Sequence, residues 1–427
     1  MVNIYIENYG CSANKSNAEI MMGLLEQAGH VIVDDIKQGK ADIIILNTCI
    51  VKGPTEKKAI KRIREIRKTK KNMIITGCMP EAQFELVKNL APKAILIGPS
   101  HIKDIVKAAD ILLNKEEKQD FTGEQHEIKL LLPKHRYNPV IDIIQISEGC
   151  DGNCSYCITR HAKGKLRLYS PEKIISEAKT AIEQGCKEIW LTSQDCASYD
   201  DLPDLLHDIA GLEGDFFVRV GMMNPNKVLP ILDELIESFK NEKIFKFIHI
   251  PVQSGNDEIL KKMNRNYTSE DFKDIIKRLR KAIPKITIST DIICGFPTET
   301  TEQFDDSIKL IKEIKPDVMN ISRFWPRPGT PAEKMEQHAS RITKDRSREL
   351  TEEFHRIALK KNQKYIGWKG KALIDEYGKQ GTDTLIARNS FYRPVIVKQN
   401  KNKKQKLVLG DFVDVEIKDA TSFDLRS

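Results

Sequence analysis

Apolar and polar residues alternate along the first hundred positions in a pattern that predicts strands separated by helices. Short runs rich in Ile, Val and Leu indicate strands, and apolar residues three or four apart indicate helices. The strand candidates are residues 3–7, 30–33, 42–47, 72–76 and 94–97, and the helix candidates are residues 17–28, 55–70 and 81–90. Since strands that alternate with helices pair in parallel, we expect an open parallel α/β sheet covered by helices.

The alternation resumes with a longer period after a polar stretch. The predicted strands are residues 140–147, 188–193, 216–221, 246–251, 286–293 and 317–323. The helical patterns between them are residues 171–184, 202–209, 228–240, 269–282 and 301–314, and a charged helical segment follows at about residues 344–365. Six strand–helix units predict a partial (β/α)6 barrel with an open side, because a closed barrel has eight units.

Short β-periodic runs punctuated by glycines fill the last part of the chain. They are residues 372–375, 384–388, 395–398, 406–409 and 412–417, and they predict a small antiparallel β-barrel. The overall fold class is therefore α/β with a small β-barrel at the end. The expected divisions are a first domain at residues 1–112, a linker at 113–135, the barrel at 136–362 and the β-barrel domain at 363–427.

Positive charge gathers in two places. The net charge is +8, and residues 52–71 contain ten Lys and Arg against two Glu, while residues 363–427 contain thirteen Lys and Arg against eight Asp and Glu. A solvated face is the commoner reason for such runs, but they permit an RNA partner. The helix at residues 57–71 and the loop at 398–406 are our candidate contacts to an RNA backbone.

The sequence also indicates a compartment. No stretch is long and apolar enough to span a membrane, and the N-terminus has no secretory signal pattern. The nine cysteines are then expected to be free, metal-bound or catalytic rather than disulfide-linked. We therefore expect a cytoplasmic protein without a membrane partner.

Three cysteines lie within eight residues, directly after the first barrel strand. Cys150, Cys154 and Cys157 have the spacing C-x3-C-x2-C. Three thiolates on one loop suit zinc or an iron–sulfur cluster, and only three ligands would leave one iron of a four-iron cluster open to a chelating cofactor. The alternative is a structural zinc site with His161 as the fourth ligand. The position at the end of a barrel strand favours an active site.

Three more cysteines, Cys11, Cys49 and Cys78, each follow a predicted strand of the first region. Because the C-terminal ends of parallel strands meet at one edge, we expect these thiols to form a second three-ligand metal site. A small buried residue is the alternative reading of each cysteine alone. Of the remaining cysteines, two are expected in the core and the third is left undecided: Cys186, Cys294 and Cys196.

Polar residues and glycines at the other barrel-strand ends are candidates for cofactor contacts. The candidates are Ser193, Gln194, Asp195, Arg219, Gln253, Asp291 and Gly295. Gly295 would let the backbone approach a ligand closely. Arg219 lies within an apolar strand, so we expect it to have a carboxylate partner.

These motifs resemble a known family. The loop at residues 150–157 is similar to the signature of radical S-adenosylmethionine (SAM) enzymes. The segments around Cys11, Cys49 and Cys78 resemble the N-terminal domain of the methylthiotransferases, and the tail resembles the RNA-binding TRAM domain that ends them. Four segments resemble the archaeal and eukaryotic branch, which acts on N6-threonylcarbamoyladenosine at position 37 of tRNA: residues 156–164, 251–255, 291–297 and 325–331.

The resemblance implies a reaction and its requirements. It implies two [4Fe–4S] clusters, SAM, a tRNA anticodon loop as partner, and donors of electrons and sulfur. Position C2 of adenine has an unactivated C–H bond, so a radical from SAM is needed to attack it. The cluster on Cys11, Cys49 and Cys78 would deliver the methylthio group. Ser193, Gln194 and Asp195 replace a Gly-Glu pair common in the superfamily, which leaves the residue that binds the methionine amino group open.

Three alternatives stay open from the sequence. The same chemistry could act on isopentenyladenosine in tRNA or on a ribosomal protein. A radical SAM enzyme could also add a methyl group without sulfur. Finally, the cysteines could hold zinc in an RNA-binding protein without catalysis.

Overall fold

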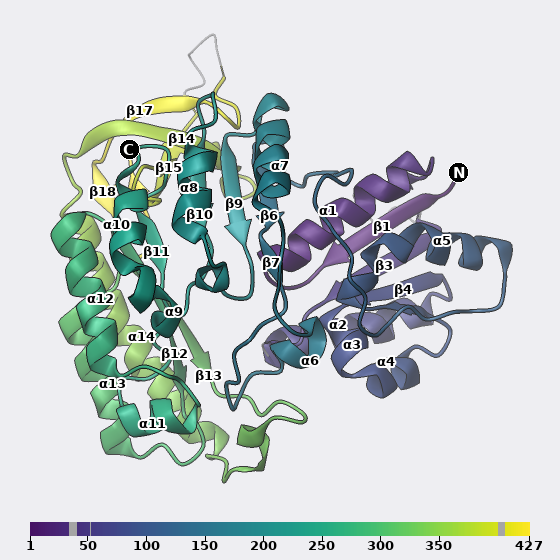
Figure 1. The fold of residues 1–427 in the computed structure, drawn as a ribbon, viewed down its shortest axis with the longest axis horizontal. Coiled ribbons are helices and arrows are strands. Elements are labelled where there is room, and N and C mark those ends of the chain that lie inside the picture. Colours follow the sequence, from purple (N-terminus) through teal and green to yellow (C-terminus); the bar gives the residue numbers. More distant parts are fainter. Residues whose placement is uncertain (34–40, 52, 400–405) are drawn as a thin grey trace.

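The computed structural model of the protein describes residues 1–33, 41–51, 53–399 and 406–427. Three regions pack together: a helix-covered sheet, drawn in purple and blue; a barrel, in teal and green; and a C-terminal sheet, in green and yellow (Figure 1). Among the described residues, no helix has the length and apolar character that crossing a bilayer requires.

The first region is the predicted open parallel sheet. Its strands are β1 (Asn3–Asn8), β2 (Val31–Ile32), β3 (Ile43–Thr48), β4 (Asn72–Gly77) and β5 (Ile95–Ile97), in the order β2-β1-β3-β4-β5. One face packs on α1 (Ser12–Gln27), α5 (Ile105–Asn114) and the 3-10 helix η1 (Pro99–Asp104), and the other on α2 (Gly53–Lys68), α3 (Cys78–Ala82) and α4 (Phe84–Leu90). The single helix predicted at residues 81–90 is thus two short helices.

The second region is the predicted partial barrel. Its strands are β6 (Ile141–Gln145), β9 (Glu188–Thr192), β10 (Phe217–Val220), β11 (Phe247–His249), β12 (Thr287–Cys294) and β13 (Val318–Arg323). They form two parallel three-stranded sheets, β6-β9-β10 and β11-β12-β13, which a bridge between Met222 and His249 connects. The outer helices are α7 (Pro171–Glu183), α8 (Leu202–Ala210), α9 (Pro225–Val228), α10 (Leu232–Lys240), α12 (Ser269–Ala282), α13 (Thr301–Ile314) and α14 (Ser340–Gln363).

Short elements decorate the ends of the barrel strands. They are β7 (Ser147–Glu148), β8 (Arg167–Leu168), α6 (Thr159–Lys163), α11 (Asp257–Lys262), and the 3-10 helices η2 (Cys196–Ser198), η3 (Leu229–Ile231) and η4 (Pro331–Lys334). Strands β7 and β8 pair in antiparallel fashion and enclose the loop that carries the C-x3-C-x2-C motif. The strand predicted at residues 140–147 is therefore divided between β6 and β7.

Helix α1 of the first region lies against the edge of barrel strand β6. The Ser16 hydroxyl donates a hydrogen bond to the Ile143 carbonyl at 3.0 Å, and Gln145 Nε2 donates to Asn17 Oδ1 at 2.8 Å. Each of these α1 side chains is about 1% exposed. Polar groups of α1 thus satisfy the edge strand that the incomplete barrel leaves unpaired.

The C-terminal region is a curled six-stranded sheet in the order β17-β14-β15-β16-β19-β18. The strands are β14 (Lys369–Tyr377), β15 (Thr384–Asn389), β16 (Pro394–Lys398), β17 (Phe412–Glu416), β18 (Asp419–Ala420) and β19 (Leu425–Arg426), and only the β16–β19 pair is parallel among them. The strand predicted at residues 406–409 is wrong, because this segment runs into a turn and the Leu407 carbonyl accepts a hydrogen bond from Gln399. Most of the predicted basic loop at 398–406 lies outside the described residues.

The C-terminal sheet covers the end of the barrel where its strands begin. The Tyr392 ring packs on Phe245 and Phe247, with centroid distances of 4.7 and 5.0 Å. Arg393 pairs with the buried Asp317 at the start of β13. This contact leaves the opposite end of the barrel, where the strands terminate, for a functional site.

Candidate functional site

Cys11, Cys49 and Cys78 form what we call the first cysteine site. Cys49 and Cys78 directly follow the adjacent strands β3 and β4, and Cys11 directly precedes α1 after β1. The side-chain carbonyl of Asn14 lies between two of them, because it accepts hydrogen bonds from Cys11 Sγ at 3.8 Å and Cys78 Sγ at 3.9 Å. The strand-end arrangement predicted from the sequence is what brings these residues together.

Backbone contacts hold the first cysteine site in shape. Asn14 Nδ2 donates to the carbonyls of Tyr9 and Thr48 at 3.1 and 2.9 Å, which ties α1 to the ends of β1 and β3. Gly77 has a φ of +93°, and a Cβ atom there would lie 2.3 Å from the Thr48 carbonyl oxygen. Only glycine therefore allows Cys78 to approach Cys49 at this position.

The first cysteine site is largely shielded from water. Cys49 and Cys78 are each 5% exposed, whereas Cys11 is exposed. Burial raises the pKa of Cys78 to about 12 and also raises the pKa of Cys49. Since a metal binds the thiolate, a metal centre held here would displace thiol protons and carry its negative charge into a poorly hydrated place.

Cys150, Cys154 and Cys157 form the second cysteine site, on the loop between β7 and α6. A Cβ atom at Gly152 would lie 3.2 Å from Cys150 Sγ and 4.0 Å from Cys154 Sγ, so the loop curls around this glycine. The Thr159 amide donates to Cys157 Sγ at 3.4 Å. All three cysteines are partly exposed, in contrast to the shielded first site.

Helices α3 and α6 connect the two cysteine sites. Helix α3 begins at Cys78, helix α6 begins two residues after Cys157, and the two helices pack against each other. Ile158, which directly precedes α6, and Ala162 of α6 lie in the same apolar cluster as Cys78. In addition, Ser12 directly follows Cys11, and its hydroxyl lies 2.9 Å from the hydroxyl of Thr192, the last residue of β9. The structure therefore places the first site at the strand-end side of the barrel, beside the second.

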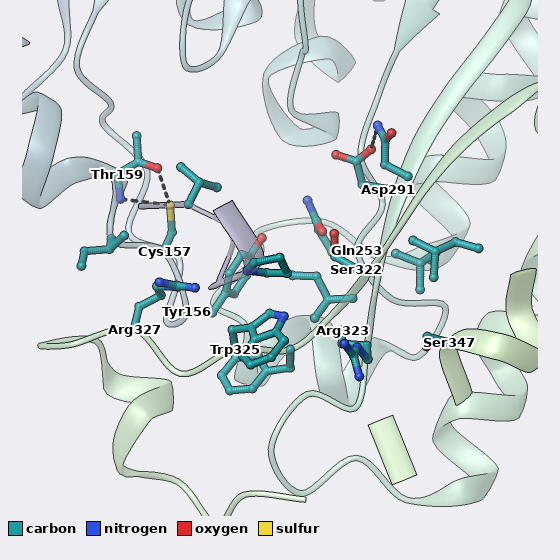
Figure 2. A pocket seen from close by; sticks show the side chains of 18 of the residues that line it. Tyr156, Cys157, Thr159, Gln253, Asp291, Ser322, Arg323, Trp325, Arg327 and Ser347 are labelled. Carbon is teal, nitrogen blue, oxygen red and sulfur yellow. Dashed lines mark hydrogen bonds between the residues drawn. The ribbon is translucent and has the colours of Figure 1, made fainter. Parts of the chain in front are cut away.

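A pocket of about 420 Å³ opens beside both sites (Figure 2). The second site contributes Tyr156 and Cys157, and the chain after Cys49 contributes Val51 and, from the start of α2, Pro54. Figure 2 shows Cys157 and Asp291 on opposite sides of the pocket, with Trp325 below them. A pocket of this volume can hold a cofactor or a nucleoside.

Two of the predicted cofactor contacts line this pocket. Gln253 has a φ of +70° and lies beside Asp291 in the lining. Asp291 Oδ1 accepts from Asn320 Nδ2 at 2.7 Å and lies 2.9 Å from His249 Nε2. These side chains give the barrel interior a polar, hydrogen-bonded wall next to the second cysteine site.

Three other candidates lie at the end of β9, outside the pocket lining. Asp195 Oδ1 accepts from the amides of Ala197 and Asn224 at 3.2 and 3.0 Å, so it caps the helix η2. The Ser193 hydroxyl accepts from the Asp195 amide at 3.0 Å. Gln194 Oε1 is buried and has no hydrogen-bond partner among the described residues, so this acceptor suits a bound donor group.

The last two candidates, Arg219 and Gly295, are also absent from the pocket lining. The expected carboxylate partner of Arg219 is wrong: its guanidinium lies instead over three aromatic rings, at 4.7 Å from Trp190, 5.3 Å from Phe247 and 5.2 Å from Tyr392. The ring of Tyr392 comes from the C-terminal sheet, so Arg219 joins that sheet to the barrel interior. Gly295 has a φ of +73° and faces Thr343 of α14.

The comparisons with known proteins agree with this geometry. Residues 144–311 match the Radical SAM superfamily, and residues 3–98 match the uncharacterized protein family UPF0004. A probable threonylcarbamoyladenosine tRNA methylthiotransferase of Pyrococcus abyssi is 44% identical over 99% of this chain and 98% of its own length. The chain belongs to the threonylcarbamoyladenosine tRNA methylthiotransferase family. The human protein of that family is 36% identical over 97% of this chain and 72% of its own length.

Solved structures support the fold of this family member. The radical SAM methyltransferase TsrM of Kitasatospora setae has a TM-score of 0.59 and 15% identity, with 89% of this chain and 79% of that chain covered. The radical SAM enzyme OxsB has a TM-score of 0.56 and 13% identity, with 84% of this chain and 56% of that chain covered. These likenesses concern the fold.

The ligand sets of this family member fit iron–sulfur clusters better than zinc. A tetrahedral zinc ion holds thiolates about 3.8 Å apart, given Zn–S bonds of about 2.3 Å. Among the described residues, no three His, Cys, Asp or Glu side chains converge closely enough for a single metal ion. His161, the proposed fourth zinc ligand, is exposed. Sites whose only ligands are three thiolates suit a four-iron cubane cluster.

The other cysteines behave as core residues. Cys186, Cys196 and Cys294 are each at most 1% exposed and belong to the main apolar core of the barrel. The expectation for Cys186 and Cys294 is confirmed, and Cys196 joins them.

Sequence reasoning missed three residues that support the sites. Asn14 braces the first site, and Arg265 donates to Cys154 Sγ at 3.2 Å. Lys163, on α6, is 4% exposed and lies between the two sites. No sequence signal marks Lys163, because a lysine six positions after a cysteine motif is expected to be exposed and its burial is visible only in the structure.

Proposed function

We propose that this chain converts N6-threonylcarbamoyladenosine at position 37 of tRNA to its 2-methylthio derivative by radical SAM chemistry. The observation that carries the proposal is the pair of three-cysteine sites that α3 and α6 hold together at the strand ends of the barrel. The names of the relatives, such as that of Pyrococcus abyssi, supply the substrate. Because tRNA is the substrate, we place the protein in the cytoplasm.

Each region has a part in this proposal. We assign the first cluster and the sulfur to residues 1–112, the SAM cluster to residues 136–362 and RNA binding to residues 363–427, with 113–135 as the linker. SAM bound at the cluster of Cys150, Cys154 and Cys157 supplies a radical that can take hydrogen from an unactivated C–H bond. A reductant and a sulfur donor are further partners in this proposal.

The chain's own residues orient the cofactor and the base. Gln253 and Asp291 form the polar wall that faces the second cysteine site, where they can bind the ribose or amino groups of a nucleoside cofactor. Gln194 offers its unused buried acceptor from the end of β9. Ser193, Asp195, Arg219 and Gly295 then act by positioning these strand ends.

Trp325 is our candidate platform for the flipped adenine. Its ring lines the pocket and has two cations near it, with Lys57 Nζ at 5.0 Å and the Arg323 guanidinium at 5.4 Å from the ring centroid. Bases extruded from an RNA loop stack on aromatic rings, and nearby cations attract the backbone. Lys57 belongs to α2, the helix predicted as an RNA contact, so α2 lines the approach to this pocket.

The proposal is tested by anaerobic reconstitution with iron and sulfide, followed by reaction with SAM, a reductant and threonylcarbamoylated tRNA. Mass spectrometry of the digested nucleosides should show a gain of one methylthio group. A product that carries a methyl group without sulfur, or modification only of isopentenyladenosine tRNA or of a ribosomal protein, would contradict the proposal. The Trp325→Leu variant should bind tRNA more weakly by about 1–3 kcal/mol, the usual contribution of one stacked base.

A further inference from the structure

Lys163 is the buried cation that the proposed function leaves without a role. It ends helix α6, and its side chain is 3% exposed. Its Nζ atom has no hydrogen-bond partner among the described residues, and the carboxylate of Glu148 is 4.0 Å away. A buried ammonium whose N–H groups have no acceptor is costly, so its position calls for an acceptor beyond the distant Glu148 carboxylate.

The first cysteine site lies next to helix α6, which carries Lys163. Ala162, the residue before Lys163, belongs to the same apolar cluster as Cys78. The packing of α6 on α3, which begins at Cys78, brings this about. Lys163 thus belongs to the helix that follows the second cysteine site, while its charge acts on the first cysteine site.

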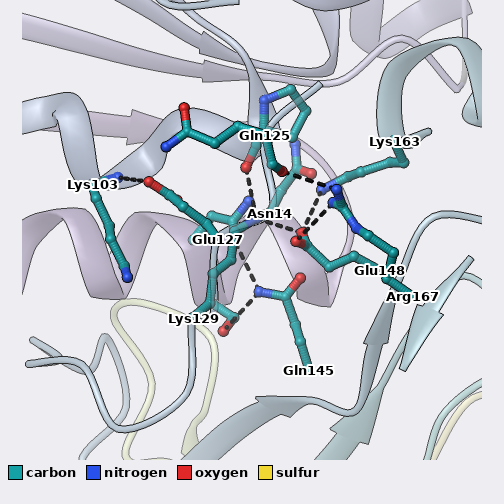
Figure 3. Close-up of polar contacts among 12 residues, drawn as sticks. Asn14, Lys103, Gln125, Glu127, Lys129, Gln145, Glu148, Lys163 and Arg167 are labelled. Atoms are coloured by element: carbon teal, nitrogen blue, oxygen red, sulfur yellow. Dashed lines mark hydrogen bonds and ion pairs between the residues drawn. The ribbon is translucent and has the colours of Figure 1, made fainter. Parts of the chain in front are cut away.

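Glu148 does not fully occupy this lysine. Figure 3 shows Lys129, Lys163 and Arg167 gathered around the Glu148 carboxylate. Lys129 Nζ donates to Glu148 and to the Pro99 carbonyl, and the Tyr169 hydroxyl donates to Glu148 at 3.0 Å. With Lys129 and Tyr169 hydrogen-bonded to the carboxylate, the N–H groups of Lys163 remain available to the cysteine side.

We propose that Lys163 is a positioning residue for the cluster on Cys11, Cys49 and Cys78, whose negative charge its ammonium offsets while its N–H groups bond cluster sulfur. This inference rests on the proposed function. Three thiolates outweigh the positive charge of a cubane, and reduction adds a further negative charge. A fixed cation beside the cluster stabilises the reduced form more than the oxidised form, and so raises the reduction potential.

The test is a potentiometric titration followed by electron paramagnetic resonance, in a parent variant with Cys150, Cys154 and Cys157 replaced by Ala. In this parent only the first site can hold a cluster. Lys163→Met should shift the midpoint potential to a more negative value, and Lys163→Arg should restore most of the shift. Lys129→Met is the matched control, because Lys129 is equally buried but is hydrogen-bonded to Glu148; its shift should be smaller.

The opposite parent makes the test specific. When Cys11, Cys49 and Cys78 are replaced by Ala, Lys163→Met should leave the potential of the second cluster nearly unchanged. Equal shifts of both clusters, or an unchanged potential in an iron-loaded Lys163→Met variant, would contradict the inference alone. A parent that holds no iron at the first site would instead contradict the proposed function, and the inference with it.

Iron retention decides the case in which Lys163→Met does not hold its cluster. Loss of iron in Lys163→Met and Lys163→Gln together with retention in Lys163→Arg would support the charge role. Loss in all three variants would show that only the packing of the lysine matters, and the inference would then be wrong.

Discussion

The two cysteine sites each bring three cysteines together, but the fold does so in different ways. The first site collects residues 38 and 29 positions apart from three neighbouring strand ends, whereas the second takes all its cysteines from one loop of eight residues. Two cysteines of the first site are only 5% exposed, but those of the second are all partly exposed. A sheet-edge site depends on the whole sheet, and a loop site depends on a few local contacts.

This difference suits the two proposed tasks. A cluster that holds a reactive sulfur benefits from a rigid, shielded place, because water and other nucleophiles are excluded. A cluster that binds and releases SAM needs an open side, and the second site lines the 420 Å³ pocket through Cys157.

Loss of a cysteine should have different consequences at the two sites. Cys154→Ala should abolish both SAM cleavage and tRNA modification, because the radical cannot form without its cluster. Cys78→Ala should abolish the methylthio product but keep the formation of 5′-deoxyadenosine. Chromatography of the small molecules and the digested tRNA measures both products in one reaction. Formation of the methylthio product by Cys78→Ala would contradict the assignment of sulfur transfer to the first site.

A change in the sheet should disable the first site without touching a cysteine. Gly77→Ala places a Cβ atom 2.3 Å from the Thr48 carbonyl oxygen at a φ of +93°, so we expect a cost of roughly 1–3 kcal/mol or more, and loss of iron from the first site. Gly29→Ala is the matched control, because Gly29 has a φ of +85° with no atom within 4 Å. Gly29→Ala should cost about 1 kcal/mol and keep the iron. Chemical denaturation and iron analysis check both variants.

The Asn14 side chain should be needed for the first site more than for the fold. Asn14→Ala removes two hydrogen bonds to backbone carbonyls and the contacts with Cys11 and Cys78, so its iron affinity should fall by roughly 10–100-fold. Asn17→Ala, also about 1% exposed on α1, lacks contact with the cysteines. Both variants should lose about 1–3 kcal/mol of stability, but only the first should lose iron affinity. Equal iron affinities would contradict the role of Asn14.

The second site should tolerate the loss of one supporting contact better. Arg265→Met removes the N–H group that lies 3.2 Å from Cys154 Sγ, while the Thr159 amide still donates to Cys157. We expect a loss of about tenfold in iron affinity, at the low end of the range for supporting residues. Chelator competition in the parent that lacks the first three cysteines measures it. A complete loss of iron would show that the loop site is as dependent on its surroundings as the sheet site.

The sequence predicted regular elements best where local signals are strong. The bounds of α12 and α13 match the predicted ranges, because capping boxes at Thr268 and Thr300 mark where each helix starts. The start of α1 was missed by five residues, since Asn14, Ser16 and Asn17 are polar yet buried. Their burial depends on β6 and the cysteine site, which no local pattern reveals.

The same distinction holds for the sites. The cysteines were predictable because strand ends and motif spacing are local features of the sequence. The supporting residues Asn14, Lys163 and Arg265 were not, because their roles depend on contacts between distant parts of the chain; Asn14 and Cys78 are 64 positions apart, and Arg265 and Cys154 are 111 positions apart. The aromatic partners of Arg219 include Tyr392 from the C-terminal sheet, which a strand-by-strand interpretation could not place.

Iron and acid-labile sulfide analysis, with zinc measured in parallel, tests the two-site account most directly. The anaerobically reconstituted wild-type chain should hold about eight iron atoms, as two four-iron clusters require, and each parent with one cysteine trio replaced by Ala should hold about four. If replacing one cysteine trio removed the iron of both sites, or if the chain held stoichiometric zinc in place of iron, the existence of two independent cluster sites would be contradicted.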